Sequence, residues 1–430
     1  MTTQRYDKSN ELFARALKTV PLASQTFSKS SHQWVEGAAP LFLQSGRGCR
    51  VTDVDGNSYI DYVLGLLPVI LGYCDPDVDA AIRAQLDEGI TFSLAHPKEV
   101  ELAEVLTEII PCAEMVRYGK NGSDVTTGAV RLARAHTGRS KIAICGYHGW
   151  HDWYIGTTTR RIGVPDAVRA LSATFPYNDA AALEKLLAAE PDGYAAIILE
   201  ADGVQQPAPG FLARLRELAT HYGVVLVFDE IITGFRLHMG GAQAHYGVTP
   251  DLACFGKSMG NGMPIAALVG KREIMRKVED IFFSTTFGGE VLSIAAALAT
   301  IEKLKRENVI ARLWARGDKL RDSANATLRQ RGLGEFVSFG GEGWWPRIKM
   351  GGGPVEANLL TSLLRQEFNA NGLLLGASFN LSLAHDNDTV AAETISAIDT
   401  AAGAVRDALD SPDPAARLRG KQVQPTFSVR

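Results

Sequence analysis

The chain has few cysteines, and their spacing fits neither a disulfide framework nor a metal site. The sequence of 430 residues contains five cysteines, an odd number, with no CxxC pair among them. Disulfide scaffolds and structural zinc sites both require closely and regularly spaced cysteines. We therefore expect reduced, mostly buried thiols. The five residues are Cys49, Cys74, Cys112, Cys145 and Cys254.

The sequence also lacks an excess of charge of one sign and lacks long apolar runs. Its formal net charge is -4, so the basic excess of a protein that binds nucleic acid or an anionic membrane is missing. No run reaches the roughly 18 apolar residues of a membrane span, and the N-terminus has no signal-peptide pattern. We expect a cytoplasmic protein with small-molecule partners and without nucleic acid or membrane.

A dinucleotide-binding fingerprint is missing as well. Several glycine pairs, such as Gly46 with Gly48 and Gly260 with Gly262, have the GxG spacing. None of them completes GxGxxG after an expected strand, which the pyrophosphate of a dinucleotide requires. The sequence therefore disfavours a nucleotide-dependent dehydrogenase.

Apolar patterning predicts an α/β fold. Residues 8–21 have helical spacing, and residues 41–62 look like short strands around a turn. From about residue 75, short apolar strands alternate with helices, which is typical of a mostly parallel sheet covered on both faces. We expect strands at 115–118, 142–145, 195–199, 224–228 and 266–269, and helices at 76–88, 99–110, 211–222 and 289–306.

The same pattern suggests three segments along the chain. Residues 1–65 form an N-terminal arm with part of a small domain, and residues 66–305 form a large domain. Residues 306–430 form a smaller α+β domain. It ends at 411–430 in a polar, proline-containing tail, either on the surface or disordered.

Lys257 and Asp229 are the first candidates for chemistry. Asp229 ends an apolar strand, and Lys257 lies between Gly256 and a glycine-rich stretch. A lysine can hold the aldehyde of pyridoxal phosphate as a Schiff base, and an acid can keep its pyridine nitrogen protonated. A carboxylate at a buried strand end needs a cationic partner. The alternative is that Asp229 or Glu230 pairs with Arg236.

A phosphate site is predicted after the strand at 115–118. The sequence Lys120-Asn121-Gly122-Ser123-Asp124 opens a helix there. Backbone N–H groups at a helix N-terminus, with a close-approach glycine and a serine hydroxyl, suit an anion. The alternative is that Ser123 or Asp124 only caps the helix.

Two further clusters follow expected strand ends. Tyr147, in the sequence Gly-Tyr-His-Gly-Trp, is placed to stack on a flat heteroaromatic ring. His148 and His151 have HxxH spacing, but without a third ligand a metal is less plausible than structural hydrogen bonds. The cluster Ser284 to Glu290 could reach a phosphate or form a capped turn.

Taken together, the motifs NGSD, GYHGW, FDEIITGFR, GGAQAHYGVTPDL, FGK and TTFGGE resemble the class III aminotransferases of fold type I, and especially glutamate semialdehyde aminomutase and its relatives. The resemblance covers about residues 10–400. It implies a pyridoxal phosphate (PLP) enzyme that works as a homodimer with active sites at the subunit interface. It also implies the fold type I arrangement of a large, mostly parallel domain and a smaller C-terminal domain.

The resemblance implies a role for individual residues. Lys257 would be the Schiff-base lysine and proton carrier, and Asp229 would bind the pyridine nitrogen. The remaining contacts would be Gly122 and Ser123 on the phosphate, Tyr147 and Ile231 on the two ring faces, Gln205 near the phenolic oxygen, and Thr286 on the phosphate of the neighbouring subunit.

Differences from the aminomutase concern the substrate. Lys29 stands where the aminomutase has a carboxylate-binding arginine, and lysine cannot make the same bidentate contact. Leu66 replaces a substrate-side tryptophan, and the segment containing Asn380 replaces one that contains a glutamate. The gating loop after the tyrosine motif, 155–165, is shortened.

The short loop favours transamination over mutase chemistry. A mutase must retain its diamine intermediate under a lid, whereas a transaminase must release one product before it binds the next substrate. We therefore expect a PLP-dependent aminotransferase that moves an amino group between an amino donor and an aldehyde or keto acceptor. The alternative is the intramolecular glutamate-1-semialdehyde 2,1-aminomutase reaction. A cofactor-binding regulator without catalysis is disfavoured because no DNA-binding segment precedes the core.

Overall fold

The computed structural model describes residues 6–424, which divide into two compact units. The terminal unit contains residues 6–75 and 311–424, and the central unit contains residues 76–310. Within these described residues, no helix combines the length and the apolar character that a membrane crossing demands. The domain boundaries expected after residues 65 and 305 stay a prediction.

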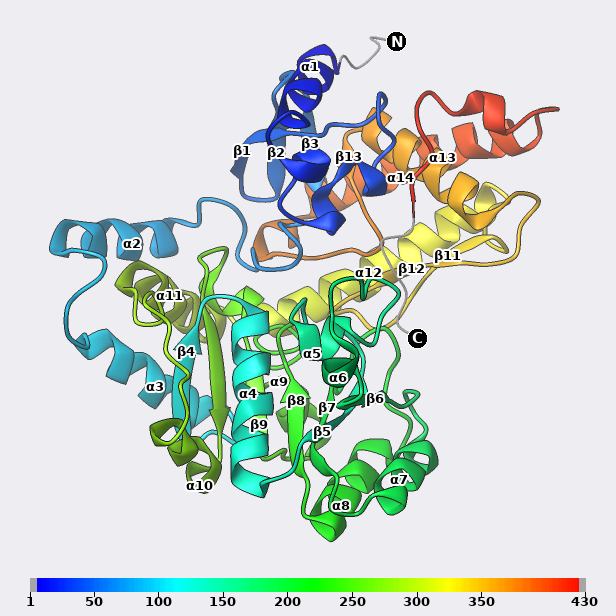
Figure 1. The fold of residues 1–430 in the computed structure, drawn as a ribbon. Helices are drawn as coiled ribbons and strands as arrows, with labels where there is room; N and C mark the ends of the chain where they lie inside the picture. Colours follow the sequence, from blue (N-terminus) through cyan, green and yellow to red (C-terminus); the bar gives the residue numbers. More distant parts are fainter. Residues whose placement is uncertain (1–5, 425–430) are drawn as a thin grey trace. The chain divides into compact units, whose positions relative to one another are not determined.

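A seven-stranded sheet forms the centre of the central unit (Figure 1). Its order is β4-β10-β9-β8-β7-β5-β6, and every neighbouring pair from β9 to β6 is parallel. Only β10 runs antiparallel, against both β4 and β9. The strands are β4 (Met115–Gly119), β5 (Lys141–Cys145), β6 (Ser172–Thr174), β7 (Tyr194–Leu199), β8 (Val225–Asp229), β9 (Leu252–Phe255) and β10 (Ala266–Gly270).

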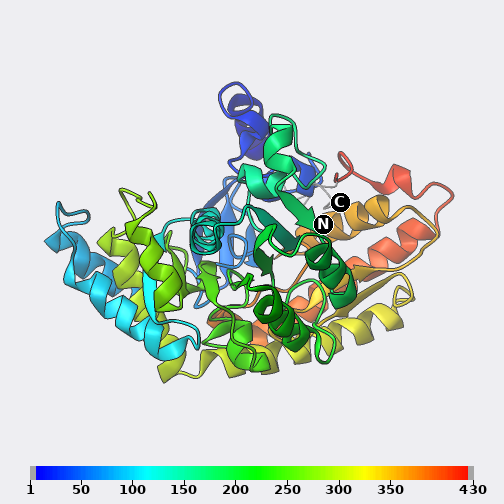
Figure 2. The same ribbon diagram turned by 60° about the horizontal axis from the view of Figure 1, so that its bottom comes forward.

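Helices cover both faces of this sheet. Helix α4 connects β4 to β5 and carries the chain toward the β6 edge of the sheet, whereas α8 connects β7 to β8 and carries it back toward β9. Because such crossovers are right-handed, connections that run in opposite directions along the sheet place their helices on opposite faces. Helices α7 and α8, at the bottom of Figure 1, come forward in Figure 2. The helices are α2 (Pro76–Glu88), α3 (Pro97–Ile109), α4 (Gly122–Thr137), α5 (Asp152–Ile155), α6 (Asp166–Arg169), α7 (Ala180–Ala189), α8 (Phe211–Tyr222), α9 (Gly241–Tyr246), α10 (Arg272–Met275) and α11 (Val291–Arg306).

The buried strands explain why this unit folds. All residues of the parallel strands β7, β8 and β9 and of the antiparallel strand β10 are buried, as expected of a sheet covered on both faces. The apolar face of α4, including Val125, Ala129 and Leu132, packs into the same core cluster as Ile198 and Val227. The sheet is therefore a rigid platform, and residues that follow its strands have fixed positions.

The terminal unit has a smaller mixed sheet. Its order is β1-β2-β3-β13, where β13 is parallel to β3 and the other pairs are antiparallel. A separate two-stranded sheet joins β11 and β12. The elements are α1 (Asp7–Ala16), β1 (Leu43–Arg47), β2 (Arg50–Asp53), β3 (Ser58–Asp61), α12 (Val309–Gln330), β11 (Val337–Gly340), β12 (Arg347–Met350), α13 (Ala357–Ala370), β13 (Leu373–Leu374) and α14 (Asp388–Leu409).

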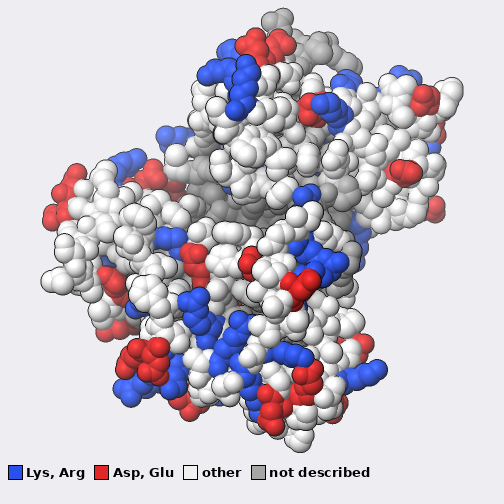
Figure 3. Space-filling model, in the orientation of Figure 1, with Lys and Arg blue, Asp and Glu red and all other residues white. Residues whose placement is uncertain are grey.

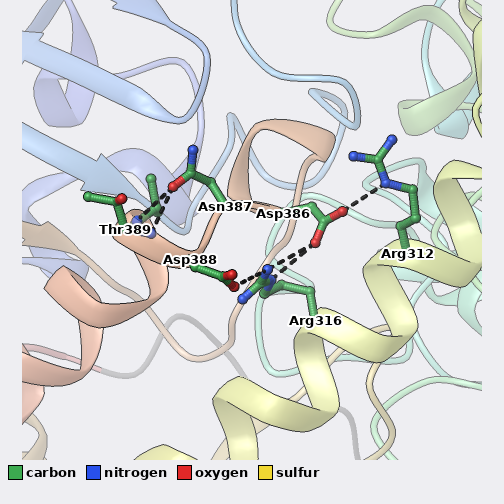
Figure 4. Close-up of polar contacts among 7 residues, drawn as sticks. Arg312, Arg316, Asp386, Asn387, Asp388 and Thr389 are labelled. Carbon is green, nitrogen blue, oxygen red and sulfur yellow. Dashed lines mark hydrogen bonds and ion pairs between the residues drawn. The ribbon is translucent and has the colours of Figure 1, made fainter.

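An ion-pair cluster joins α12 to the start of α14 in the terminal unit (Figure 4). Asp386 accepts hydrogen bonds from Arg312 at 2.7 Å and from Arg316 at 3.1 Å. Burial alone would raise the pKa of Asp386, but the two arginines lower it below its ordinary value. Asn387 caps α14 through the backbone N–H of Thr389. The cluster fixes where α14 begins.

Most of the predicted elements are present, with three differences. The N-terminal helix was expected to run to about residue 21 but ends at Ala16. Strands β6 and β9 were not predicted, because each is only three or four residues long. In the predicted tail, Val423 is buried and Lys421 donates its backbone N–H to Glu36, so residues 411–424 lie on the terminal unit, while residues 425–430 lie outside the described residues.

Candidate active site

Two neighbouring parallel strands bring Lys257 and Asp229 to one edge of the sheet. Asp229 is the last residue of β8 and pairs in register with Cys254 of β9. Lys257 follows the last residue of β9, Phe255, by two positions and begins a short 3-10 turn, Lys257–Gly260. Ligands in open parallel sheets bind beyond these carboxyl ends. The missed strand β9 is therefore the element that places the lysine beside the acid.

Asp229 is held in a fixed orientation by His148. Asp229 is buried, and its Oδ2 lies 2.8 Å from His148 Nδ1. The other ring nitrogen, Nε2, donates to the carbonyl of Cys145 at 3.0 Å. Asp229 Oδ1 accepts the backbone N–H of Ile231 at 3.1 Å. Because each oxygen has one protein partner, the carboxylate cannot rotate freely, and it keeps lone pairs for a further donor.

Lys257 is suited to act as a neutral amine. Its backbone has φ +41°, a left-handed conformation that is uncommon for a residue with a side chain. Burial lowers the pKa of Lys257 below its ordinary value, while the negative charges of Glu200 and Asp229 raise it in part. A lysine nucleophile reacts in its deprotonated form, so the lowered pKa increases the reactive fraction.

Glu200 also belongs to this group, although it was not predicted from the sequence. It follows Leu199 at the end of β7, the parallel neighbour of β8, and Leu199 pairs in register with Phe228. Its Oε2 accepts the backbone N–H of Tyr147 at 3.0 Å. The signal was available, since an acid directly after a buried strand is the same pattern that identified Asp229.

The start of α4 forms a close-packed cradle. An added Cβ at Gly122 would lie 3.3 Å from the side chain of Ile231, and one at Gly149 would lie 2.1 Å from Ser123 Oγ. Ser123 is buried, and its Oγ accepts the backbone N–H of Trp150 at 3.4 Å. The predicted helix cap is also present: Asp124 accepts the backbone N–H groups of Lys120 and Asn121. Capping is therefore the role of Asp124 and leaves Ser123 for another partner.

Tyr147 presents an aromatic ring next to this group. Its ring is part-exposed and meets the ring of Tyr154 edge to face, with centroids 5.5 Å apart. Tyr154 is fully buried, and the ring of His148 lies against it at 5.5 Å. Tyr147 and His148 therefore share one aromatic support. Within the described part of the chain, the Tyr154 hydroxyl has no hydrogen-bond partner.

The alternative interpretations of the motifs can be compared with the contacts. Among residues 6–424 no group of three His, Cys, Asp or Glu side chains could hold a metal ion. His151 Nδ1 lies 2.7 Å from the hydroxyl of Thr127, so both histidines of the HxxH pattern make structural hydrogen bonds. Glu230 accepts the backbone N–H groups of Ala242 and Gln243 and caps α9. Asp229 and Glu230 thus have different roles.

Two predicted cofactor contacts lie on exposed loops. Gln205 is exposed in the loop after β7, and Thr286 is exposed in the loop before α11. Within residues 6–424 no hydrogen bond joins either side chain to Lys257 or Asp229. The roles of Gln205 and Thr286 stay predictions.

The predicted substrate residues belong to the terminal unit. Lys29 is exposed and lines a cavity of about 560 Å³ with Trp34, Val63 and other residues of that unit. Leu66 has a left-handed backbone, with φ +79°. Asn380 is buried: its Nδ2 donates to the carbonyl of Val63, and its Oδ1 accepts the indole N–H of Trp345. These hydrogen bonds fix the orientation of the Asn380 side chain, and its contact with substrate stays a prediction.

The residues of the central unit fit pyridoxal phosphate. A pyridine N–H requires a fixed, buried acceptor, and Asp229 provides one. An aldehyde requires an amine with a lowered pKa, and Lys257 provides one. A phosphate requires close backbone approach at a helix start, which the tight contacts of Gly122 and Gly149 provide.

Comparison with known proteins identifies the family of the chain. Residues 32–340 match the family model of the class-III aminotransferases. The 3-aminobutyryl-CoA aminotransferase of Cloacimonas acidaminovorans is 42% identical over 79% of this chain and 83% of that protein. The glutamate-1-semialdehyde 2,1-aminomutase of Pelotomaculum thermopropionicum is 40% identical over 76% and 79%. The structure of the PLP-bound FumI protein of Sphingopyxis sp. MTA144 has a TM-score of 0.87 at 28% identity, over 95% of this chain and 99% of that one. The chain therefore belongs to the class III aminotransferases, enzymes that depend on pyridoxal phosphate, and has their fold type I architecture.

Proposed function

We propose that Lys257 and Asp229 are the catalytic residues of this aminotransferase. Lys257 would hold the aldehyde of pyridoxal phosphate, and Asp229, oriented by His148, would accept the pyridine N–H. Gly122 and Ser123 would bind the phosphate. Tyr147 and Ile231 would contact the two ring faces, Gln205 would lie near the phenolic oxygen, and Thr286 would bind the phosphate from a second subunit. The observation that carries the proposal is the placement of Lys257 and Asp229 at the ends of neighbouring parallel strands.

The bound cofactor supplies an electron sink that stabilises the negative charge left when a substrate carbon loses its proton. Lys257 Nζ takes that proton as a general base and returns it as a general acid. The lowered pKa of Lys257 suits both steps, because a group titrating closer to neutral pH exchanges its proton more readily. Asp229 would accept the pyridine N–H from a fixed, buried position.

Substitution of Lys257 tests this assignment directly. Lys257→Ala should lose the visible absorption of covalently held cofactor and nearly all amino transfer, whereas Lys271→Ala, at a part-exposed lysine paired with Asp251, should keep both. Borohydride reduction followed by mass spectrometry should locate the cofactor on Lys257 in the wild type. A Lys257→Ala enzyme with wild-type absorption and turnover would remove Lys257 from its proposed role.

We propose transamination between two molecules as the reaction, with the aminomutase reaction as the second candidate. The segment 155–165, from the last residue of α5 to the start of α6, is short, and its Ile162 is exposed, so it supplies little of the lid that a mutase needs. Addition of an amino donor alone should convert the enzyme to its aminated state and release one keto product. Conversion of glutamate-1-semialdehyde without net exchange of partners would identify the aminomutase instead.

The substrate is proposed to carry an anionic group that Lys29 contacts. Lys29 lines the cavity of about 560 Å³ in the terminal unit, which is also lined by Trp34 and Val63. One relative is named as an aminotransferase of 3-aminobutyryl-CoA, which makes 3-amino acids and their CoA thioesters the first donors to screen. Lys29→Gln should raise KM for an acidic donor about tenfold and leave an uncharged amine donor unchanged.

We further propose that the enzyme is a homodimer. Apolar side chains are exposed on two loops of the central unit: Leu94 is 85%, Phe282 is 82% and Phe287 is 59% exposed. The loops are neighbours, because Val291 donates its backbone N–H to the carbonyl of Ile90. Thr286 lies in one of them, so a second copy covering this surface would bring Thr286 to its phosphate. A cytoplasmic location stays a prediction from the sequence.

A further inference from the structure

Glu200 is a charged group at the cofactor site to which the proposed mechanism gives no part. It follows β7, directly beside β8, whose last residue is Asp229. It is only partly exposed, although a carboxylate in such a place costs free energy unless it is paired. Burial and the negative charge of Asp229 raise the pKa of Glu200, and His148, the Tyr147 N–H and Lys257 lower it in part.

The contact between Glu200 and Tyr147 is closely fitted. Glu200 Oε2 accepts the backbone N–H of Tyr147 at 3.0 Å. An added Cβ at the preceding residue, Gly146, would lie 2.8 Å from the same oxygen. Gly146 also has φ +100°, so the chain turns at this point in a conformation that favours glycine. The turn points the Tyr147 N–H at Glu200. The same main-chain position determines where the Tyr147 ring lies.

The second relationship is electrostatic. The charged groups that act on Lys257 are Glu200, Asp229 and Arg236, and Glu200 is the stronger of the two acids that raise its pKa. The groups that act on Glu200 are Asp229, His148 and Lys257. Asp229 also contacts the His148 ring, whereas Glu200 accepts the uncharged backbone N–H of Tyr147.

We propose that Glu200 is a positioning residue of the cofactor site, whose carboxylate anchors the main chain of Tyr147 and sets the protonation of Lys257. The inference rests on the proposed role of Lys257. It predicts two separable effects, because glutamine can keep the hydrogen bond from Tyr147 but not the charge, whereas alanine keeps neither.

The test uses the cofactor-free enzyme and measures how fast it captures pyridoxal phosphate, by absorbance, as a function of pH. Only neutral Lys257 reacts, so the midpoint of the profile reports its pKa. In Glu200→Gln the anion that raises this pKa is lost, so the midpoint should shift to lower pH by about one unit. Glu190→Gln, at an exposed acid paired with Lys141, should superimpose on the wild type.

Glu200→Ala should show the same shift in midpoint and, in addition, about tenfold weaker equilibrium binding of pyridoxal phosphate, because Tyr147 loses its anchor. If Glu200→Ala does not fold, the profile of Glu200→Gln decides alone. A midpoint of Glu200→Gln that is unchanged or shifted to higher pH would overturn the proposal. Failure of the proposed function is distinct: Lys257→Ala would then capture the cofactor as the wild type does, or the wild type would capture none.

Discussion

Asp229 Oδ2 and His148 Nδ1 lie 2.8 Å apart, and the imidazole is held on its other side by the carbonyl of Cys145. Because a carbonyl oxygen can only accept a hydrogen bond, Nε2 of His148 is the donor to Cys145, and Nδ1 is the nitrogen that faces the Asp229 carboxylate. The buried histidine thus orients the acid.

Substitution of His148 should reduce cofactor affinity and kcat, because Asp229 loses the side chain that orients it. We expect His148→Ala to reduce cofactor affinity and kcat by about 10- to 100-fold each, since a hydrogen bond to a buried charged group contributes about 1.5–3 kcal/mol. His148→Gln, whose amide can still donate to Asp229, should recover part of the loss. The exposed His136→Ala serves as control. Equal activity of the His148→Ala and wild-type enzymes would show that Asp229 needs no orientation.

Gly149 provides a test of the cradle at Ser123. Gly149→Ala would place a Cβ 2.1 Å from Ser123 Oγ and would also strain a backbone with φ +101°. We expect a loss of about 2–4 kcal/mol in the free energy of unfolding, with weaker cofactor binding.

Gly163→Ala is the matched control, because φ is +90° there and no atom lies within 4 Å of the added Cβ. It should cost only the backbone strain, about 1–2 kcal/mol. Thermal unfolding measures both variants. Adding Ser123→Ala to Gly149→Ala should restore part of the difference; a double variant no more stable than Gly149→Ala would show that the steric contact is not the cause.

The sequence predicted five strands of the central sheet, β4, β5, β7, β8 and β10, because they are apolar runs bounded by helices or turns, but it did not predict the short strands β6 and β9. Strand β9 was missed because its four residues, Leu252–Phe255, have the same local pattern as a buried turn. Hydrogen bonds to the neighbouring strands β8 and β10 make this segment a strand. Lys257 and Asp229 were identified from residue type at strand ends. Glu200 satisfies the same rule, but its partner is a backbone N–H, which leaves no trace in the sequence.

The histidines show a different limit. HxxH spacing alone left metal binding and structural bonding open, and the choice depended on residues distant in the chain: Asp229 for His148 and Thr127 for His151. The order of the strands in the sheet brings these distant residues together. For the same reason the sequence could not assign Glu230 to the start of α9.

The apolar side chains exposed on two loops of the central unit predict a homodimer. A charged side chain introduced among them should weaken the association of the two subunits. Arg117 and Arg131 donate to the carbonyls of Phe283 and Phe282, so the loop before α11 has a fixed conformation. Phe287→Asp would then place a charge on the proposed contact surface. We expect dissociation to monomers at micromolar concentration in analytical ultracentrifugation, together with weaker cofactor binding because Thr286 is withdrawn from the second subunit. Ile162→Asp, on another exposed loop, should stay dimeric. A wild type that sediments as a monomer at all concentrations would overturn the prediction.

Stability should depend on pH through Asp251, which joins β8 to the start of β9. This buried acid accepts hydrogen bonds from Lys271 at 2.7 Å, from Arg216 at 2.9 Å and from the backbone N–H of Leu226 at 2.8 Å. Burial alone would raise the pKa of Asp251, but these partners outweigh it and lower the pKa below the ordinary value of 3.8. A lowered folded-state pKa means that the stabilisation is fully present above about pH 4 and is lost as pH falls through the folded-state pKa.

Asp251→Asn should therefore destabilise the protein by about 2 kcal/mol at pH 7, and the difference from the wild type should shrink as pH falls below 4. Urea unfolding at pH 7, 5 and 3.5 measures this difference. The control is Asp192→Asn, at an exposed acid paired with Arg139, which should change the free energy of unfolding by less than about 1 kcal/mol. A difference between Asp251→Asn and the wild type that stays constant from pH 7 to 3.5 would show that the loss arises from packing, since Asp251 is the titrating group by which the two proteins differ.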